Sequence, residues 1–147
     1  APSHIMSLEK YLSFPALGNM HAAISQTLDD FNQALSTVKI FRQNYEDMKE
    51  ANTIGADKYF HAKANAHSSQ LGGAGQNMAS FISNAREFTD IYKNLLVKRM
   101  SISDTIQDMI FDSAANVYGQ VRGSANKNKD ARSLVNYYRP RGLPEKY

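Results

Sequence analysis

Apolar side chains recur every three or four residues along most of the chain, the spacing that places them on one face of a helix. Such series predict helices over residues 19–52, 57–70 and 76–100, and a fourth from Ser103, its expected N-cap, to Gly123. No segment shows the sustained apolar–polar alternation of a half-buried strand. Because the connections are short, the sequence predicts an all-α fold, an antiparallel four-helix bundle.

The series over residues 19–52 is long for a small bundle. A helix of about 30 residues spans roughly 45 Å, and the segment 57–70 covers only about half of that length. The excess needs another cover, and we expect self-association, with lipid or an apolar ligand as the competing cover. Burial inside the bundle is the other interpretation of such stripes. The residues expected in this ligand or oligomer seam are Ile24, Leu28, Phe31, Leu35, Val38 and Phe41.

Residues 124–147 do not continue the helical pattern. They end in RPRGLPEKY, where two prolines and a glycine exclude a helix. Because Leu134 and Val135 add apolar area, we predict that residues 124–147 form a strap wrapped across a bundle of residues 7–123, in a single domain. Residues 1–6 lack the basic and apolar regions of a signal peptide and are expected to be a remnant of processing or cloning.

Composition and charge narrow the picture further. The chain has 147 residues, of which 42% are hydrophobic, enough for one buried core. It has no cysteine, which excludes disulfides, thiolate zinc sites and cysteine nucleophiles. It also has no run of about 18 apolar residues that would span a bilayer. The net charge is +3, but residues 122–147 hold seven basic and two acidic residues, a net of +5. This basic tail would attract a polyanion or pair with the acidic remainder.

Two motifs raise the question of chemistry. Asp57 and His61 share a helix face, an arrangement that could orient an imidazole for acid–base work or begin a metal site. His67 lies away from that face and no H-E-x-x-H motif occurs, so we expect a structural pair, no metal, no cofactor and no enzyme activity. The glycines of LGGAG (71–75) follow no buried strand and precede no G-K-[ST]. They predict an interhelical turn, not a phosphate loop.

Five separated blocks stand out along the chain: YEDMKEANTIGADKYFHAKAN (45–65), GGAG (72–75), ISNARE (82–87), DSAANVYG (112–119) and YRPRGLPEKY (138–147). In this order they resemble the serum amyloid A family, over roughly residues 35–147. The resemblance implies four helices with a wrapped C-terminal tail and oligomers. It also implies binding of lipid surfaces, retinol-like molecules and heparin-like polyanions, and a tendency to form amyloid. The chain departs from the family in having no tryptophan and in a longer segment at 91–111.

The resemblance also bears on four basic residues. In the family, the arginine that matches Arg86 contributes to a site for sulfated sugars, so His61 and Arg86 are expected to form part of a polyanion site. Arg139 and Arg141 of the tail complete this candidate set. Alternatively, Arg86 holds the strap by donating to its carbonyl groups. Nucleic acid is not an expected partner, because the body of the chain is acidic.

We therefore expect a secreted binding protein that sequesters lipid or a small apolar ligand and contacts polyanions. One alternative is the terminal, membrane-perturbing effector or toxin module of a larger bacterial secreted protein. Another is a structural module whose stripes are covered by self-association alone. The gene context separates the first two, because a signal peptide favours the carrier and a long upstream fusion favours the effector.

Overall fold

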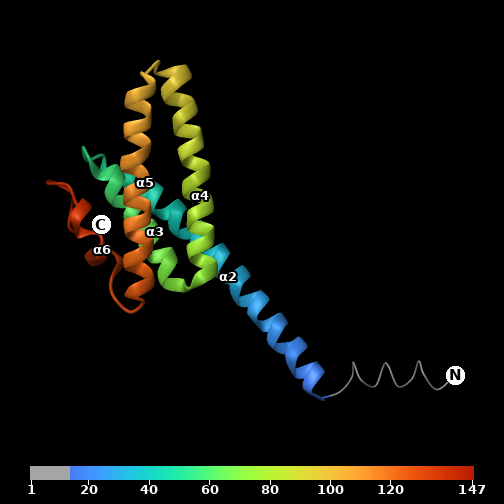
Figure 1. Ribbon diagram of the computed structural model, residues 1–147. Coiled ribbons are helices and arrows are strands. Elements are labelled where there is room, and N and C mark those ends of the chain that lie inside the picture. The colour runs from blue at the N-terminus through green and yellow to red at the C-terminus, as the bar shows by residue number, and fades with distance from the viewer. Residues whose placement is uncertain (1–13) are drawn as a thin grey trace. The chain divides into compact units, whose positions relative to one another are not determined.

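The structure is a computed structural model that describes residues 14–147, and within this range all regular elements are helical and no strand occurs. The all-α prediction is thus confirmed, and the hypothesis on residues 1–6 lies outside the described range. The elements shown in Figure 1 are α2 (Phe14–Ala51), α3 (Ala56–Leu71), α4 (Gly73–Tyr92), the π-helical turn η1 (Lys93–Val97), α5 (Ile102–Ala125), α6 (Ala131–Leu134) and the 3-10 turn η2 (Asn136–Tyr138).

Several helix bounds differ from the sequence-based expectation. The helix expected over residues 76–100 is α4 over Gly73–Tyr92, followed by η1. α2 begins at Phe14, five residues before Asn19, because Pro15 falls in the first turn, where its missing N–H costs no hydrogen bond. The prediction that Ser103 caps the fourth helix is wrong. Ser101 is the N-cap of α5, and its Oγ accepts a hydrogen bond from the Asp104 N–H at 3.0 Å. The predicted interhelical turn is present but consists of Gly72 alone, because Gly73 and Gly75 belong to the first turn of α4.

The chain divides into two units, residues 1–32 and residues 33–147. The described part of the first unit, residues 14–32, is one continuous stretch of α2. The second unit contains the rest of α2, the helices α3, α4 and α5, and the C-terminal segment. The candidate seam residues are therefore shared between the units, with Ile24, Leu28 and Phe31 in the first.

The core of the second unit is built around α3. Its aromatic residues Tyr59 and Phe60 are fully buried, and so are most of its alanines. The C-terminal segment supplies the opposite side of this core with buried Val135, Leu143 and Tyr147. The Phe60 and Tyr147 rings meet edge to face, with 5.6 Å between their centroids. The predicted strap over the helices is therefore present in the structure.

α3 and α5 approach each other so closely that glycine is required on α5. A Cβ atom on Gly119 would collide with the main-chain oxygen of Ala62, and one on Gly123 with that of Ala66. Ala115, one turn earlier on α5, is also completely buried. Small residues spaced four apart on both helices thus bring the two backbones into direct contact.

A polar network lies in the same interface and joins three helices. The amide of Asn65 on α3 is fully buried, and its Nδ2 donates to Ser83 Oγ on α4 and to Asn116 Oδ1 on α5, both at 3.1 Å. Its Oδ1 accepts from Gln120 Nε2 at 2.9 Å. Asn116 Nδ2 in turn donates to Glu87 Oε1 at 2.7 Å. Because these buried groups satisfy one another, they fix the relative register of α3, α4 and α5.

The tight α3–α5 contact gives the first testable prediction. Gly119→Ala should lower the free energy of unfolding by about 1–3 kcal/mol, because the added methyl group must push the helices apart. In an uncrowded helix the same change stabilises by up to about 1 kcal/mol. Gly73→Ala at the start of α4, where a Cβ meets no atom within 4 Å, is the matched control. Urea unfolding compares the two, and a Gly119→Ala protein at least as stable as the parent would contradict the packing described.

Candidate functional site

Within the second unit, the inward face of α2 carries buried polar side chains beside its apolar ones. Thr37 is fully buried and Asn44 nearly so, and the Thr37 hydroxyl lies 3.5 Å from the Gly75 main-chain oxygen of α4. Leu35 and Val38 are 46% and 49% exposed. The predicted apolar series is therefore divided in this unit, because Leu35 and Val38 are exposed whereas Phe41 and Met48 are partly buried.

In the first unit, taken by itself, all residues from 17 to 32 are exposed, so no face of α2 is buried there. Ile24, Leu28 and Phe31 are each more than half exposed. Phe41 behaves differently from the other candidate seam residues, because it is partly buried and lines a pocket in the second unit. The predicted seam thus consists of exposed side chains up to Val38 and turns inward at Phe41.

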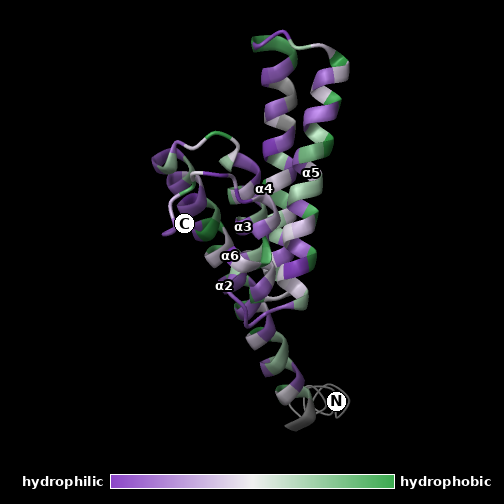
Figure 2. Cartoon of the chain, turned by 90° about the vertical axis from the view of Figure 1, so that its left-hand side faces the viewer, coloured by the Kyte–Doolittle hydropathy of each residue, from purple (hydrophilic) through white to green (hydrophobic). Residues whose placement is uncertain are grey.

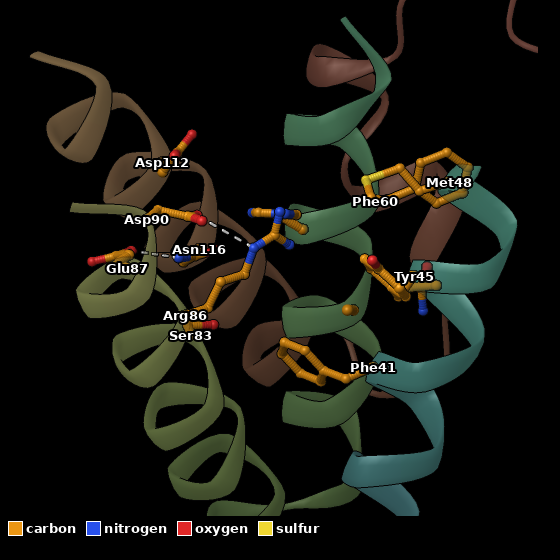
Figure 3. Close-up of a pocket in the computed structure, with 13 residues that line it drawn as sticks. Phe41, Tyr45, Met48, Phe60, Ser83, Arg86, Glu87, Asp90, Asp112 and Asn116 are labelled. Atoms are coloured by element: carbon orange, nitrogen blue, oxygen red, sulfur yellow. Dashed lines mark hydrogen bonds and ion pairs between the residues drawn. The ribbon is translucent and has the colours of Figure 1, made fainter. Parts of the chain in front are cut away.

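This pocket lies among α2, α3, α4 and α5 and has two chemically different walls (Figure 3). One wall is apolar and includes Phe41, Tyr45 and Met48 of α2 and Phe60 of α3. The other wall is polar and comes from α3, α4 and α5. Its members are His61, Ser83, Arg86, Glu87, Asp90, Asp112 and Asn116. Tyr45 is also half exposed, so it connects the pocket with the outer surface of α2.

A charged cluster closes the polar wall. His61 Nε2 lies 3.1 Å from Asp57 Oδ1, and Arg86 Nη2 lies 3.1 Å from the same oxygen. Arg86 Nε is also 3.5 Å from Asp90 Oδ2, the ion pair drawn in Figure 3. The contact with His61, and then the charge of Arg86, hold the pKa of Asp57 well below its usual range.

These contacts decide two sequence-based expectations. The structural pairing of Asp57 with His61 is confirmed. The hypothesis that Arg86 holds the strap is wrong, since Arg86 pairs with Asp57 and Asp90. Arg122 and Arg139 hold the strap instead, through main-chain oxygens of the C-terminal segment.

One pocket residue that the sequence did not single out is Asn44. Its Nδ2 donates to the Ile40 carbonyl at 2.9 Å, which fixes the orientation of the amide. Its Oδ1 is buried and has no hydrogen-bond partner among the described residues. A buried acceptor left in this way favours a ligand or water that brings a donor. The available signal was a polar residue set between the apolar positions Phe41 and Met48 of one helix.

Arg139 forms the main attachment of the strap. Its guanidinium donates to Tyr59 Oη at 3.1 Å and to the main-chain oxygens of Tyr147 and Pro144 at 2.7 and 2.8 Å. It also stacks on the Tyr59 ring, 5.3 Å from the centroid. Arg141 is exposed.

The four candidate polyanion residues therefore occupy different surroundings. His61 and Arg86 meet at Asp57, and Arg139 is engaged within the strap. Polyanion binding by this set stays a prediction.

Within the described residues, no helix has the length and hydropathy needed to cross a bilayer. In the same part of the chain, no three His, Cys, Asp or Glu side chains gather as a metal site would require.

The described chain is all-α, its second unit is closed by a C-terminal strap, and large apolar side chains are exposed along α2. Residues 28–147 match the family model of serum amyloid A protein. The chain is 38% identical to serum amyloid A protein of Bos taurus over 123 residues, 84% of this chain and 87% of the relative. It is 38% identical to that of Ovis aries over 122 residues, 83% of this chain and 100% of the relative. It is also 38% identical to serum amyloid A-1 protein of Homo sapiens over 103 residues, 70% of this chain and 69% of the relative. This chain belongs to the serum amyloid A family.

The Asp57 cluster predicts a pH dependence of stability. A carboxyl whose pKa is lowered by folding stabilises the protein above its unfolded pKa of about 3.9, and this contribution is lost as the pH falls below that value. Asp57→Asn should therefore unfold at lower urea concentration near neutral pH and approach the parent in acid. Asp29→Asn, on the exposed surface of α2, is the control. A difference from the parent that grows on acidification would contradict the assignment.

The strap contacts predict unequal effects of two neighbouring arginines. Arg139→Ala should cost about 2–4 kcal/mol, because several charge-assisted hydrogen bonds are lost and the buried Tyr59 hydroxyl loses a partner. Arg141→Ala removes the same charge from an exposed site and should change stability by less than about 0.5 kcal/mol. Thermal unfolding followed by circular dichroism measures both. Equal melting temperatures for the two variants would show that the strap is not held by Arg139.

Proposed function

We propose that this protein binds lipid or a small apolar ligand through the exposed face of α2, and that it is a binding protein and not an enzyme. The observation that carries the proposal is the exposure of the large apolar side chains of this series. Five candidate seam residues, Ile24, Leu28, Phe31, Leu35 and Val38, keep about half of their surface in contact with solvent. A series of large aliphatic and aromatic side chains on one helix face is a recurrent mark of lipid or partner binding.

The energetics favour an occupant for this face. Covering a Leu, Ile or Phe side chain contributes about 1.5–3 kcal/mol when burial is complete. Here each side chain has roughly half of its surface left to cover. Several such contributions along one helix exceed the cost of holding an apolar molecule at the surface. An assembly of several copies would cover the same residues, so self-association and lipid binding are expected to compete.

The pocket next to this face supports binding of a ligand with a polar end. Phe41 and Tyr45 extend the apolar surface of α2 into the pocket, where Asn44 Oδ1 offers an unused acceptor. A hydroxyl or amine group on an otherwise apolar ligand would satisfy that oxygen. The polar wall of the pocket would then contribute selectivity, since a ligand without a donor leaves Asn44 unpaired.

The cellular setting is part of the same proposal. A carrier of apolar molecules acts where those molecules must cross water, and we propose an extracellular location. Contacts with sulfated polysaccharides through His61, Arg86, Arg139 and Arg141 remain a proposal that rests on the charge of the three arginines. Arg141 is the best placed of the four for such contacts, because it is the one that is exposed.

Substitutions on the α2 face test this function. Phe31→Ser combined with Val38→Ser should weaken binding to neutral phosphatidylcholine vesicles by about tenfold or more, because covering the exposed half of the two side chains contributes about 1.5–3 kcal/mol together. Ile54→Ser removes a side chain that is 98% exposed outside the helices and is the matched control. Vesicle flotation gives the affinities, and size-exclusion chromatography with light scattering gives the subunit number. If the parent protein is monomeric and binds neither vesicles nor apolar dyes, the proposal is wrong.

A further inference from the structure

A second exposed apolar cluster lies far from α2 in the sequence, at the free end of the hairpin formed by α4 and α5. Figure 1 shows this end projecting beyond α3, and Figure 2 shows hydrophobic and hydrophilic segments side by side there. Leu96 and Val97 close η1, and Ile102 opens α5. Their exposed fractions are 64%, 70% and 71%. We call residues 93–102 the hairpin tip.

The hairpin tip is an ordered turn. The Lys98 N–H donates to the Lys93 carbonyl at 2.9 Å, and the Met100 N–H donates to the Asn94 carbonyl at 2.7 Å. The Asn94 side chain is buried and lies 3.3 Å from Asp108 Oδ2 of α5. The apolar side chains are thus presented from a fixed backbone, which lowers the entropy cost of binding.

Basic side chains surround the apolar ones. Lys93, Lys98 and Arg99 are all exposed, and none of them forms an ion pair with another described residue. Arg99 has a φ of 52°, a left-handed conformation that a bulky residue rarely adopts and that turns the chain at the tip.

Acidic residues lie farther along the hairpin. Asp104 lies in the first turn of α5, where it stabilises the helix N-terminus. Asp90, Asp108 and Asp112 lie on the two helices away from the tip and line pockets between them. The hairpin is therefore basic at its tip and acidic below it.

We propose that the hairpin tip inserts into the surface of an anionic phospholipid membrane. Exposed aliphatic side chains next to unpaired cations are the two signals that together give stable attachment to such a surface. The acidic residues below the tip would be repelled by anionic headgroups, so only the end of the hairpin enters. A second copy of this chain is a poorer occupant, because it would bring the cations of two tips together. A polysaccharide would use the cations and leave the aliphatic side chains exposed.

The absence of tryptophan from the chain allows a direct test. Val97→Trp places a single fluorophore at the tip, Tyr137→Trp places one on the strap at a residue that is 80% exposed, and Phe31→Trp places one on the α2 face. With vesicles that contain phosphatidylserine, the Val97→Trp emission should shift to the blue and be quenched by brominated lipid. The Tyr137→Trp emission should not change. With phosphatidylcholine alone the Val97→Trp shift should be much smaller.

Charge and apolarity are then removed separately. Lys98→Gln with Arg99→Gln should weaken attachment to anionic vesicles by about fivefold for each charge. Lys127→Gln with Lys129→Gln removes two exposed charges elsewhere and is the matched control. Leu96→Ser with Ile102→Ser should abolish the blue shift of Val97→Trp and leave the melting temperature unchanged, because both side chains are exposed.

The outcomes separate this inference from the proposed function. If the emission of Phe31→Trp shifts to the blue and that of Val97→Trp does not change, insertion of the tip is wrong and lipid binding by α2 is still supported. A Val97→Trp shift that is equal on neutral and anionic vesicles, or binding of Lys98 and Arg99 to heparin with no response to vesicles, would also overturn it. A shift confined to Val97→Trp on anionic vesicles would support the tip and argue against the α2 face.

Discussion

The backbones of α3 and α5 lie in contact because Gly119 and Gly123 present no side chain to Ala62 and Ala66. This approach leaves room between the helices only for short polar groups, and the amide of Asn65 fills it with hydrogen bonds to α4 and α5. The α3–α5 interface is therefore stabilised by close packing of small residues and by a satisfied polar network, whereas most bundles use large aliphatic side chains there. Large apolar side chains on α2 and at the hairpin tip are not needed in this interface and can contact a ligand or membrane. The outward faces of α2 and of the hairpin follow from this division.

The strap completes the enclosure of α3 on its remaining side. Its buried residues Leu134, Val135, Leu143 and Tyr147 form one cluster with Tyr59 and Phe60. A segment with two prolines cannot satisfy its own carbonyl groups as a helix does, and Arg139 donates to several of them instead. The guanidinium thus supplies the hydrogen bonds that backbone N–H groups would donate to these carbonyl groups in a helix. Its engagement also explains why a basic segment does not offer all of its charges to an external anion.

The helical period in the sequence located the long helices, and glycine marked the turns after α2 and α3. It did not locate the end of α4, because the apolar series continues past Tyr92 with no glycine before α5. It did not show which face of α2 is buried, since burial depends on the shape of α3 and α4 at the contact. Thr37 and Asn44 fit there, and Leu35 does not. The two serines Ser101 and Ser103 are equal candidates for a cap, and only the backbone at Ser101 has the extended conformation that a cap needs. Asn65 carried no periodic signal, although its alanine-rich surroundings indicated a crowded helix.

The enclosure of α3 has a consequence for motion in the native protein. Because α2, α4, α5 and the strap leave Ala62, Asn65 and Ala66 with no solvent-exposed surface, the amide hydrogens at the centre of α3 have no local route to water. Their isotope exchange would require opening of the whole second unit, whereas the exposed stretch of α2 in the first unit would exchange through local fraying. α3 would be the last segment to exchange, and its protection would report the global stability of the fold.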